Sequence, residues 1–173
     1  MRPGVPDIVS VSCVGEPMPG IVEPLDEPVS KFLWDLHMYW RSKRGQAFAP
    51  PWSAIGAQEM KPWLNNLALV DVVGDEPRFR CRLFSTALVR AYGADITGRW
   101  MHECDLNFVL YDLIAQMARV VREKQPNTLR ARFTKTTDGR YLDYERIALP
   151  LSDDGEHVNM IVCGYKIYEA GAT

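Results

Sequence analysis

The sequence predicts a single α+β domain in which an antiparallel sheet carries its helices on one face, with an N-terminal helical flank. Three observations predict it. Residues 78–84 alternate charged and apolar side chains, and the pattern then changes within two residues to the spacing of a helix. The pairs Asp138-Gly139 and Asp154-Gly155 mark hairpin turns between three late strand-like segments. The resulting order along the chain is helix, two strands, several helices and three strands. Two groups of hairpin-connected strands separated by helices suggest one antiparallel sheet.

Length and composition are those of one globular domain. The chain has 173 residues, of which 47% are hydrophobic, and its formal net charge is -2. We expect a flexible, proline-rich leader over residues 1–28, a helical flank over 29–66 and the core over 67–170. The near-neutral charge predicts neither nucleic acid nor a membrane as a partner. Four cysteines without a Cys-x-x-Cys pair, and the lack of a long apolar run, predict a reduced cytoplasmic protein.

The flank contains an amphipathic helix over residues 29–44, which Gly45 ends. Trp34 and Met38 lie one turn apart, away from its main apolar stripe. These two side chains either pack on their own domain or form a dimer contact, because large exposed apolar groups mark interfaces. We predict a homodimer through them.

The remaining elements follow from turn signals and periodicity. Residues 53–64 form a short, irregular helical stretch, and residues 67–73 and 78–84 are strands. Ser85 or Thr86 caps a helix that Gly93 ends, and Asp105 or Asn107 begins the long inner helix that closes before Pro126. Residues 128–135, 140–151 and 157–168 are the last three strands.

Several motifs occur together in order: LHMYW at 36–40, LVDV at 69–72, RFR at 78–80, TALV at 86–89, YGADITGR at 92–99, YER at 144–146 and LPLSDDG at 149–155. With them the chain, from Leu36 to Gly164, resembles a PAS domain, and more closely the small single-PAS proteins of bacteria. The resemblance implies a five-stranded antiparallel sheet of order 2-1-5-4-3 and a pocket between sheet and helices. The sequence departs from the family pattern at Phe84-Ser85, where a glycine is expected.

PAS modules bind haem, flavins, other chromophores or small organic acids. A haem-binding member places a histidine on the long inner helix, whereas residues 107–125 have none, and His102 just before it reads as a surface histidine. A photoactive flavin site needs Asn-Cys-Arg-Phe where this chain has Glu103-Cys104-Asp105-Leu106, and acidic neighbours argue against a reactive Cys104. The identity of any cofactor stays open, and no metal site is predicted.

The candidate ligand-binding residues are apolar side chains with polar tips: Cys81, Tyr92, Trp100, Tyr111, Phe133, Tyr144 and Cys163. A possible acid-binding set, Arg80, Arg82, Arg130 and Arg132, faces away from the core by alternation, and the family strand order places it on the two edge strands. We interpret Asp143 and Glu145 as a solvated strand face, and Glu145-Arg146 as a structural ion pair.

The resemblance implies a stand-alone cytoplasmic PAS sensor, not an enzyme, that binds a small ligand or a partner protein and signals through protein contacts. The chain ends soon after its last strand, so we expect no separate output domain. A ligand-free homodimeric scaffold shares every one of these features. A small isomerase or dehydratase is the third alternative, and it requires His102, Asp71 or Glu145 to converge in the pocket.

Overall fold

A computed structural model describes residues 21–104, 107–134 and 141–169. Within this part the strands are β1 Ile21–Leu25, β2 Leu67–Val73, β3 Arg78–Phe84, β4 Asn127–Thr134, β5 Tyr141–Leu151 and β6 Met160–Glu169. The α-helices are α1 Lys31–Arg44, α2 Thr86–Tyr92 and α3 Asn107–Glu123. Short 3-10 turns occupy Trp52–Ala54, Leu64–Asn66 and Met101–Glu103. The α+β class is confirmed.

The described strands form one antiparallel sheet of order β1-β4-β5-β6-β2-β3. Leaving out β1, the five core strands follow the order that the PAS resemblance implies, read from the β3 edge. The sixth strand is the difference: β1 lies within the expected leader and pairs with β4, from Ile21 opposite Arg132 to Leu25 opposite Thr128. The predicted edge position of Arg130 and Arg132 is therefore wrong, because β1 covers β4.

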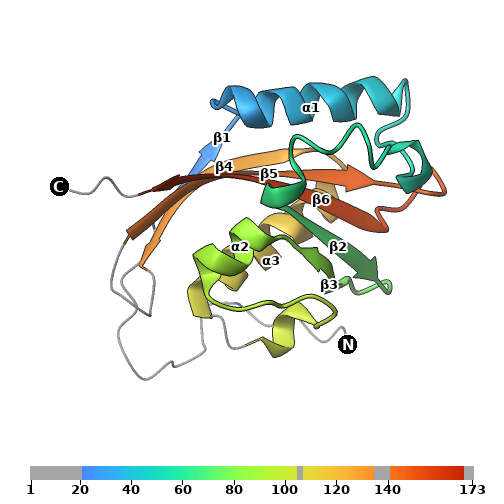
Figure 1. The fold of residues 1–173 in the computed structure, drawn as a ribbon. Coiled ribbons are helices and arrows are strands. Elements are labelled where there is room, and N and C mark those ends of the chain that lie inside the picture. The colour runs from blue at the N-terminus through green and yellow to red at the C-terminus, as the bar shows by residue number, and fades with distance from the viewer. Residues whose placement is uncertain (1–20, 105–106, 135–140, 170–173) are drawn as a thin grey trace.

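Helices cover both faces of the sheet (Figure 1). The short α2 and the long α3 lie on one face, and α1 of the flank lies across the other, so the expected placement of helices on one face holds for α2 and α3. Two hydrophobic clusters result, one between α1 and the sheet around Leu33, Leu36 and Ile147, and one between the sheet and α2 and α3 around Phe79 and Met117. A strand in the middle of this sheet is thus buried on both faces.

The start and end of α1 follow the local sequence. The Ser30 hydroxyl accepts a hydrogen bond from the Leu33 N–H at 3.3 Å, which caps the helix. Gly45 ends it with φ 57°, a conformation that a side chain disfavours. The expected irregular helix over 53–64 is replaced by turns, including the 3-10 turns on either side of it.

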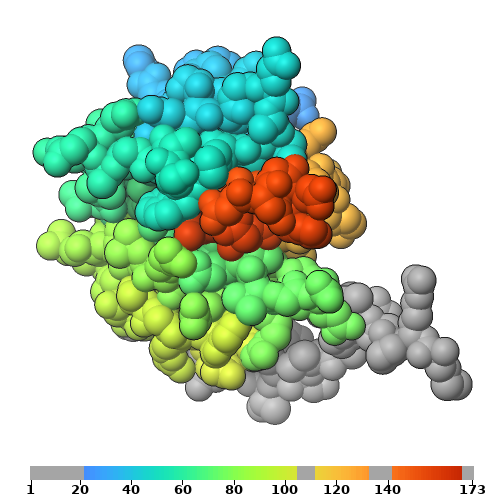
Figure 2. Space-filling model, turned by 90° about the vertical axis from the view of Figure 1, so that its right-hand side faces the viewer, coloured from blue at the N-terminus to red at the C-terminus, as the bar shows by residue number. Residues whose placement is uncertain are grey.

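The turn between β5 and β6 is longer than the sequence suggested, because β6 begins at Met160 and not at His157. One carboxylate oxygen of Asp154 accepts the backbone N–H groups of Glu156 and His157 at 2.8 and 2.7 Å. The orange-red turn lies at the surface against the cyan segment that follows α1 (Figure 2), where the Trp52 N–H donates to Asp153 at 3.0 Å. The expected turn at Asp138-Gly139 lies outside the described residues.

Candidate functional site

A buried arginine lies between the sheet and its inner helices. Alternation along β5 directs Tyr144, Arg146 and Ala148 toward α2 and α3, and Arg146 is 0% exposed. A guanidinium cannot lose its proton in a protein, so it carries a full charge into the interior. Such a charge is costly unless it is paired and fully hydrogen-bonded.

The partners of Arg146 satisfy only part of its hydrogen-bonding capacity. Its Nε donates to Oε1 of Gln116 at 2.5 Å, and the amide nitrogen of Gln116 donates to the Asn127 carbonyl at 2.8 Å, which fixes the amide's orientation. Both terminal nitrogens, Nη1 and Nη2, are buried without a hydrogen-bond partner among the described residues. Arg146 also forms no ion pair with a described carboxylate.

Aromatic rings surround the guanidinium. Its central carbon lies 5.4 Å from the ring centroid of Tyr144 and 5.5 Å from that of Tyr165, which is within the range of cation–π attraction. Tyr92 of α2 meets Tyr165 edge to face, with ring centroids 6.3 Å apart. The hydroxyl oxygens of all three tyrosines are buried.

Burial raises the pKa values of the titratable groups around Arg146. Burial raises the pKa of Cys163 to about 12, although the positive charge of Arg146 opposes this, and burial raises the pKa of Cys81 to about 12 as well. Burial also raises the pKa of Tyr165. Asp112 of α3 is close enough for the charge of Arg146 to lower its pKa, but burial raises it by more. The two thiols and the Tyr165 hydroxyl near this cation are therefore uncharged at physiological pH.

Four of the predicted ligand-binding residues belong to this region. Tyr92, Tyr144, Cys81 and Cys163 are part of, or pack against, the hydrophobic cluster under α2 and α3. Trp100 lies apart from them, since its ring stacks against Arg78 at 4.4 Å and its backbone bridges to Arg80. Tyr111 and Phe133 are in α3 and β4, and their side chains lie outside the described part of the structure.

Sequence reasoning missed Arg146, Gln116 and Tyr165. The prediction of a Glu145–Arg146 ion pair is wrong, because neighbouring residues of a strand point to opposite faces. The alternation that correctly placed Asp143 and Glu145 on one strand face also places Arg146 on the opposite face, away from Glu145.

Glu145 anchors the start of α1 on the other face. It is 0% exposed, so its interpretation as part of a solvated strand face is also wrong. Its Oε1 accepts the N–H groups of Val29 and Ser30 at 2.8 and 3.1 Å. Oε2 lies 3.9 Å from Nη2 of Arg130. A carboxylate at the beginning of a helix also interacts favourably with the helix dipole.

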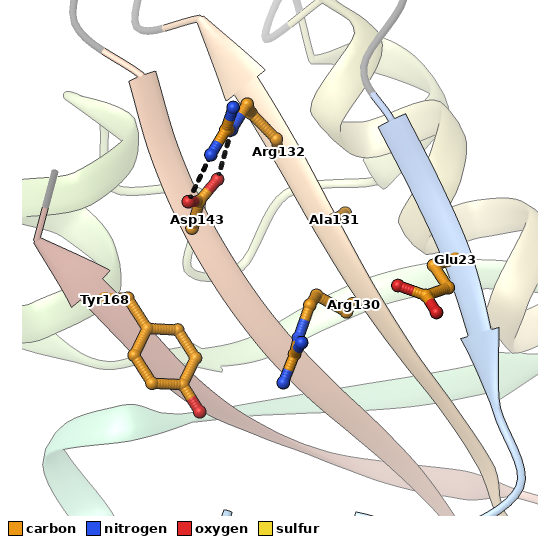
Figure 3. Close-up of a pocket in the computed structure, with 6 residues that line it drawn as sticks. All are labelled: Glu23, Arg130, Ala131, Arg132, Asp143 and Tyr168. Carbon is orange, nitrogen blue, oxygen red and sulfur yellow. Dashed lines mark hydrogen bonds and ion pairs between the residues drawn. The ribbon is translucent and has the colours of Figure 1, made fainter. Parts of the chain in front are cut away.

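The α1 side of the sheet also carries an open groove of about 520 Å³ (Figure 3). Four neighbouring strands line it, with Glu23, Arg130, Ala131, Arg132, Asp143 and Tyr168. Arg132 binds Asp143 through two hydrogen bonds of 2.6 and 2.8 Å, drawn as dashed lines in Figure 3. The cations of this groove thus already face carboxylates of the same chain, in contrast to Arg146.

The other two arginines of the possible acid-binding set are also paired. Arg80 and Arg82 lie on β3, which is an edge strand as predicted, and each forms an ion pair with Asp71, at 3.3 and 2.9 Å. These ion pairs with Asp71 agree with the interpretation of Arg80 and Arg82 as structural and not ligand-binding residues.

Comparison with known proteins gives the family. Residues 30–165 match a family described as PAS domain, which is most of the chain. The chain belongs to the PAS domain family. This membership and the fold support a sensory signalling domain. No curated protein matches the sequence.

Solved structures of similar fold are PAS and light-oxygen-voltage domains. The PAS domain of BvgS from Bordetella pertussis is 15% identical with a TM-score of 0.49, covering 79% of this chain and 88% of that chain. A light-oxygen-voltage domain studied with a flavin analogue is 12% identical with a TM-score of 0.47, covering 65% and 83%. The light-oxygen-voltage protein of Rhodobacter sphaeroides is 13% identical with a TM-score of 0.43, covering 66% and 69%.

The residues that the enzyme alternative requires have separate partners in this PAS domain. Asp71 pairs with Arg80 and Arg82, Glu145 holds the start of α1, and His102 lies beside Arg78, with 3.1 Å between its Nε2 and an arginine nitrogen. PAS domains are generally sensory rather than enzymatic. Within the described residues, three or more His, Cys, Asp or Glu side chains do not gather in a way that would hold a metal ion. The helices of this part are too short or too polar to cross a membrane.

Proposed function

We propose that the protein is a stand-alone cytoplasmic PAS sensor that binds a small ligand beside Arg146 and reports binding through α1 to a partner protein. The observation that carries this proposal is the buried guanidinium whose Nη1 and Nη2 have no partner among the described residues. Proteins rarely leave such groups unpaired, so a ligand group at this place would remove a large energetic cost.

The route to α1 starts on β5. Arg146 faces the proposed ligand, and the preceding residue, Glu145, holds the first N–H groups of α1 from the opposite face. A displacement of this part of β5 therefore acts on both sites. Trp34 and Met38 of α1 are partly exposed, and we propose them as the contact between two copies of the chain.

Native mass spectrometry and an absorption spectrum of the full chain, purified from more than one host, test ligand binding. We expect an added mass that is released on denaturation. Clean ligand-free protein from every host would instead favour the homodimeric scaffold. Fractionation of cells, with detection of the protein at its full mass, tests the cytoplasmic, stand-alone state.

Sedimentation velocity tests the dimer. Burying one Trp or Met side chain contributes about 1.5 to 3 kcal/mol, so Trp34→Asp should convert the dimer to a monomer. Leu64→Asp is the matched control, because Leu64 is 41% exposed and lies in a 3-10 turn outside α1. A wild-type monomer at high concentration, unchanged by Trp34→Asp, would refute the dimer.

A further inference from the structure

We propose that a second site, between the last turns of α1 and the end of α3, binds a hydroxylated organic phosphate such as a sugar phosphate. An open pocket of about 470 Å³ lies there, within the size range of small-molecule sites. Its lining comes from the segment before α1, from α1 itself and from residues 123–126 at the end of α3. The tyrosines and cysteines around Arg146 do not line it, so the inference is independent of the ligand proposed there.

Three cations line this pocket without a carboxylate of their own. Arg41 and Arg44 of α1 are three residues apart and share a helix face, and Lys124 directly follows α3. None of the three forms an ion pair with a described carboxylate. By contrast, Glu123 of the same pocket is already bound by Arg119 at 3.0 Å. The pocket therefore offers three positive charges to an anionic ligand.

An imidazole of the same helix face has an unused nitrogen. His37 lies one turn before Arg41, and its Nδ1 is buried without a hydrogen-bond partner among the described residues. Buried polar atoms are rarely left without a partner. A phosphate oxygen in the pocket would supply the acceptor that this nitrogen lacks, because a neutral imidazole can donate one N–H.

The backbone of Lys124 is strained. Its φ is 53°, and within the described part of the chain it is the one residue other than glycine with a positive φ. A glycine adopts this conformation at the end of a helix at little cost, whereas a side chain disfavours it. Its Nζ lies 5.4 Å from the ring centroid of Phe48, which also lines the pocket. A ligand that uses the charge of Lys124 explains why a lysine stands where glycine would fit better.

The mixture of charges selects the class of ligand. A phosphate ester accepts hydrogen bonds on three oxygens in different directions, which suits cations from two helices, whereas a planar carboxylate matches a single guanidinium fork. Asp26 and Glu27 also line the pocket and are exposed. Their carboxylates accept hydrogen bonds from hydroxyl groups and repel a polyanion. A molecule with one phosphate and several hydroxyls matches both walls, and inorganic phosphate would use only the cations.

Titration calorimetry of the full chain tests the inference with ribose 5-phosphate and glycerol 3-phosphate. Ribose, glycerol and inorganic phosphate are the matched probes at equal ionic strength, and phosphatidylcholine vesicles with phosphatidic acid test a lipid headgroup as the source of the phosphate. We expect saturable binding of at least one soluble ester, about 10-fold weaker binding of inorganic phosphate, and none of ribose or glycerol. Failure of both esters to bind, inorganic phosphate binding as tightly as the better ester, or binding to the vesicles alone would overturn the inference.

Variants locate the site. Lys124→Gly removes a charge and relieves the backbone, so it should weaken ester binding by about 10-fold while the Tm without ligand stays equal or rises. Arg41→Gln should cause a similar loss. Lys31→Gln is the control, because Lys31 lies at the other end of α1 and pairs with Asp35 at 2.6 Å, and affinity should not change. Equal losses in all three variants would indicate a diffuse effect of net charge and refute the site.

A measurement on wild-type protein does not depend on how the variants fold. The chain has three histidines, so the spectrum of His37→Gln assigns the imidazole signals of His37. These signals should shift when the ester is added and stay in place with ribose, while those of His102 and His157 do not respond. An ester that binds without moving the His37 signals would occupy another place on the molecule, and the proposed site would be refuted.

Discussion

Gly164 of β6 is the position where α1 comes closest to the sheet. A methyl group built on Gly164 would overlap Cδ2 of Leu36 and lie 3.2 Å from Cδ2 of Leu33 and 3.4 Å from Cγ2 of Ile147. Leu33 and Leu36 are 0 and 1% exposed, so neither can move its methyl groups into solvent. The absence of a side chain at Gly164 thus lets α1 dock.

We predict that Gly164→Ala lowers the free energy of unfolding by about 1 to 3 kcal/mol, the usual cost of an added methyl group in a packed core. For a chain of this size each kcal/mol corresponds to roughly 2 to 4 °C in Tm. Urea unfolding followed by tryptophan fluorescence measures the change. Hydrogen exchange should show weaker protection of α1 than in the wild type, because the clash lies under this helix.

Two further variants make the prediction specific. Gly56→Ala is the control, since its methyl group would meet only the side chain of Glu59, and a change within about 0.5 kcal/mol is expected. Leu36→Ala alone should cost about 2 to 5 kcal/mol, but less in the Gly164→Ala background, because the cavity accommodates the new methyl group. Identical urea midpoints for wild type and Gly164→Ala, or additive effects of the pair, would show that α1 does not pack on Gly164.

Three other predictions concern buried polar groups. Glu145→Gln should cost about 1 to 3 kcal/mol and speed hydrogen exchange of the Ser30 amide, because the acceptor at the start of α1 is weakened; unchanged exchange there would contradict this role. Burial lowers the pKa of His37, so the unfolded chain binds its proton first, and stability should fall as pH drops below about 6.5. In His37→Gln that slope should flatten, and an identical slope would remove His37 as its cause. Cys81 and Cys163, with pKa values of about 12, should resist iodoacetamide at neutral pH in the folded protein and react on unfolding, as read by mass spectrometry.

The strand pattern of this chain was readable from the sequence because its signals are local. The alternation of β3 and the apolar run of β2 gave both strands with their observed bounds, and Gly93 ends α2 in the left-handed conformation with φ 81°. β1 was missed because Pro24 and its neighbouring prolines are typical of a leader, whereas proline is tolerated on an edge strand. The strand order itself came from the PAS resemblance, since no local pattern encodes it.

The ligand-binding region was predictable in its apolar part only. Tyr144 and Cys163 follow from strand alternation, which shows which side chains face the inner helices. The contact between Gln116 of α3 and Arg146 depends on how helix and sheet are placed in space. Trp100 was predicted on the same grounds as Tyr144, as an apolar side chain with a polar tip. Its backbone instead pairs with Arg80 of the edge strand β3, a contact that the local sequence does not indicate.

The burial of both Glu145 and Arg146 follows from two features of the fold. β5 is an interior strand of the sheet, and helices cover both faces of that sheet. Two consecutive charged residues in the middle of such a strand point to opposite faces, so both must be buried and neither can neutralise the other. Glu145 meets the N–H groups at the start of α1, a partner that the chain itself supplies. Arg146 has the corresponding need on the other face, where, among the described residues, its one hydrogen-bond partner is Gln116.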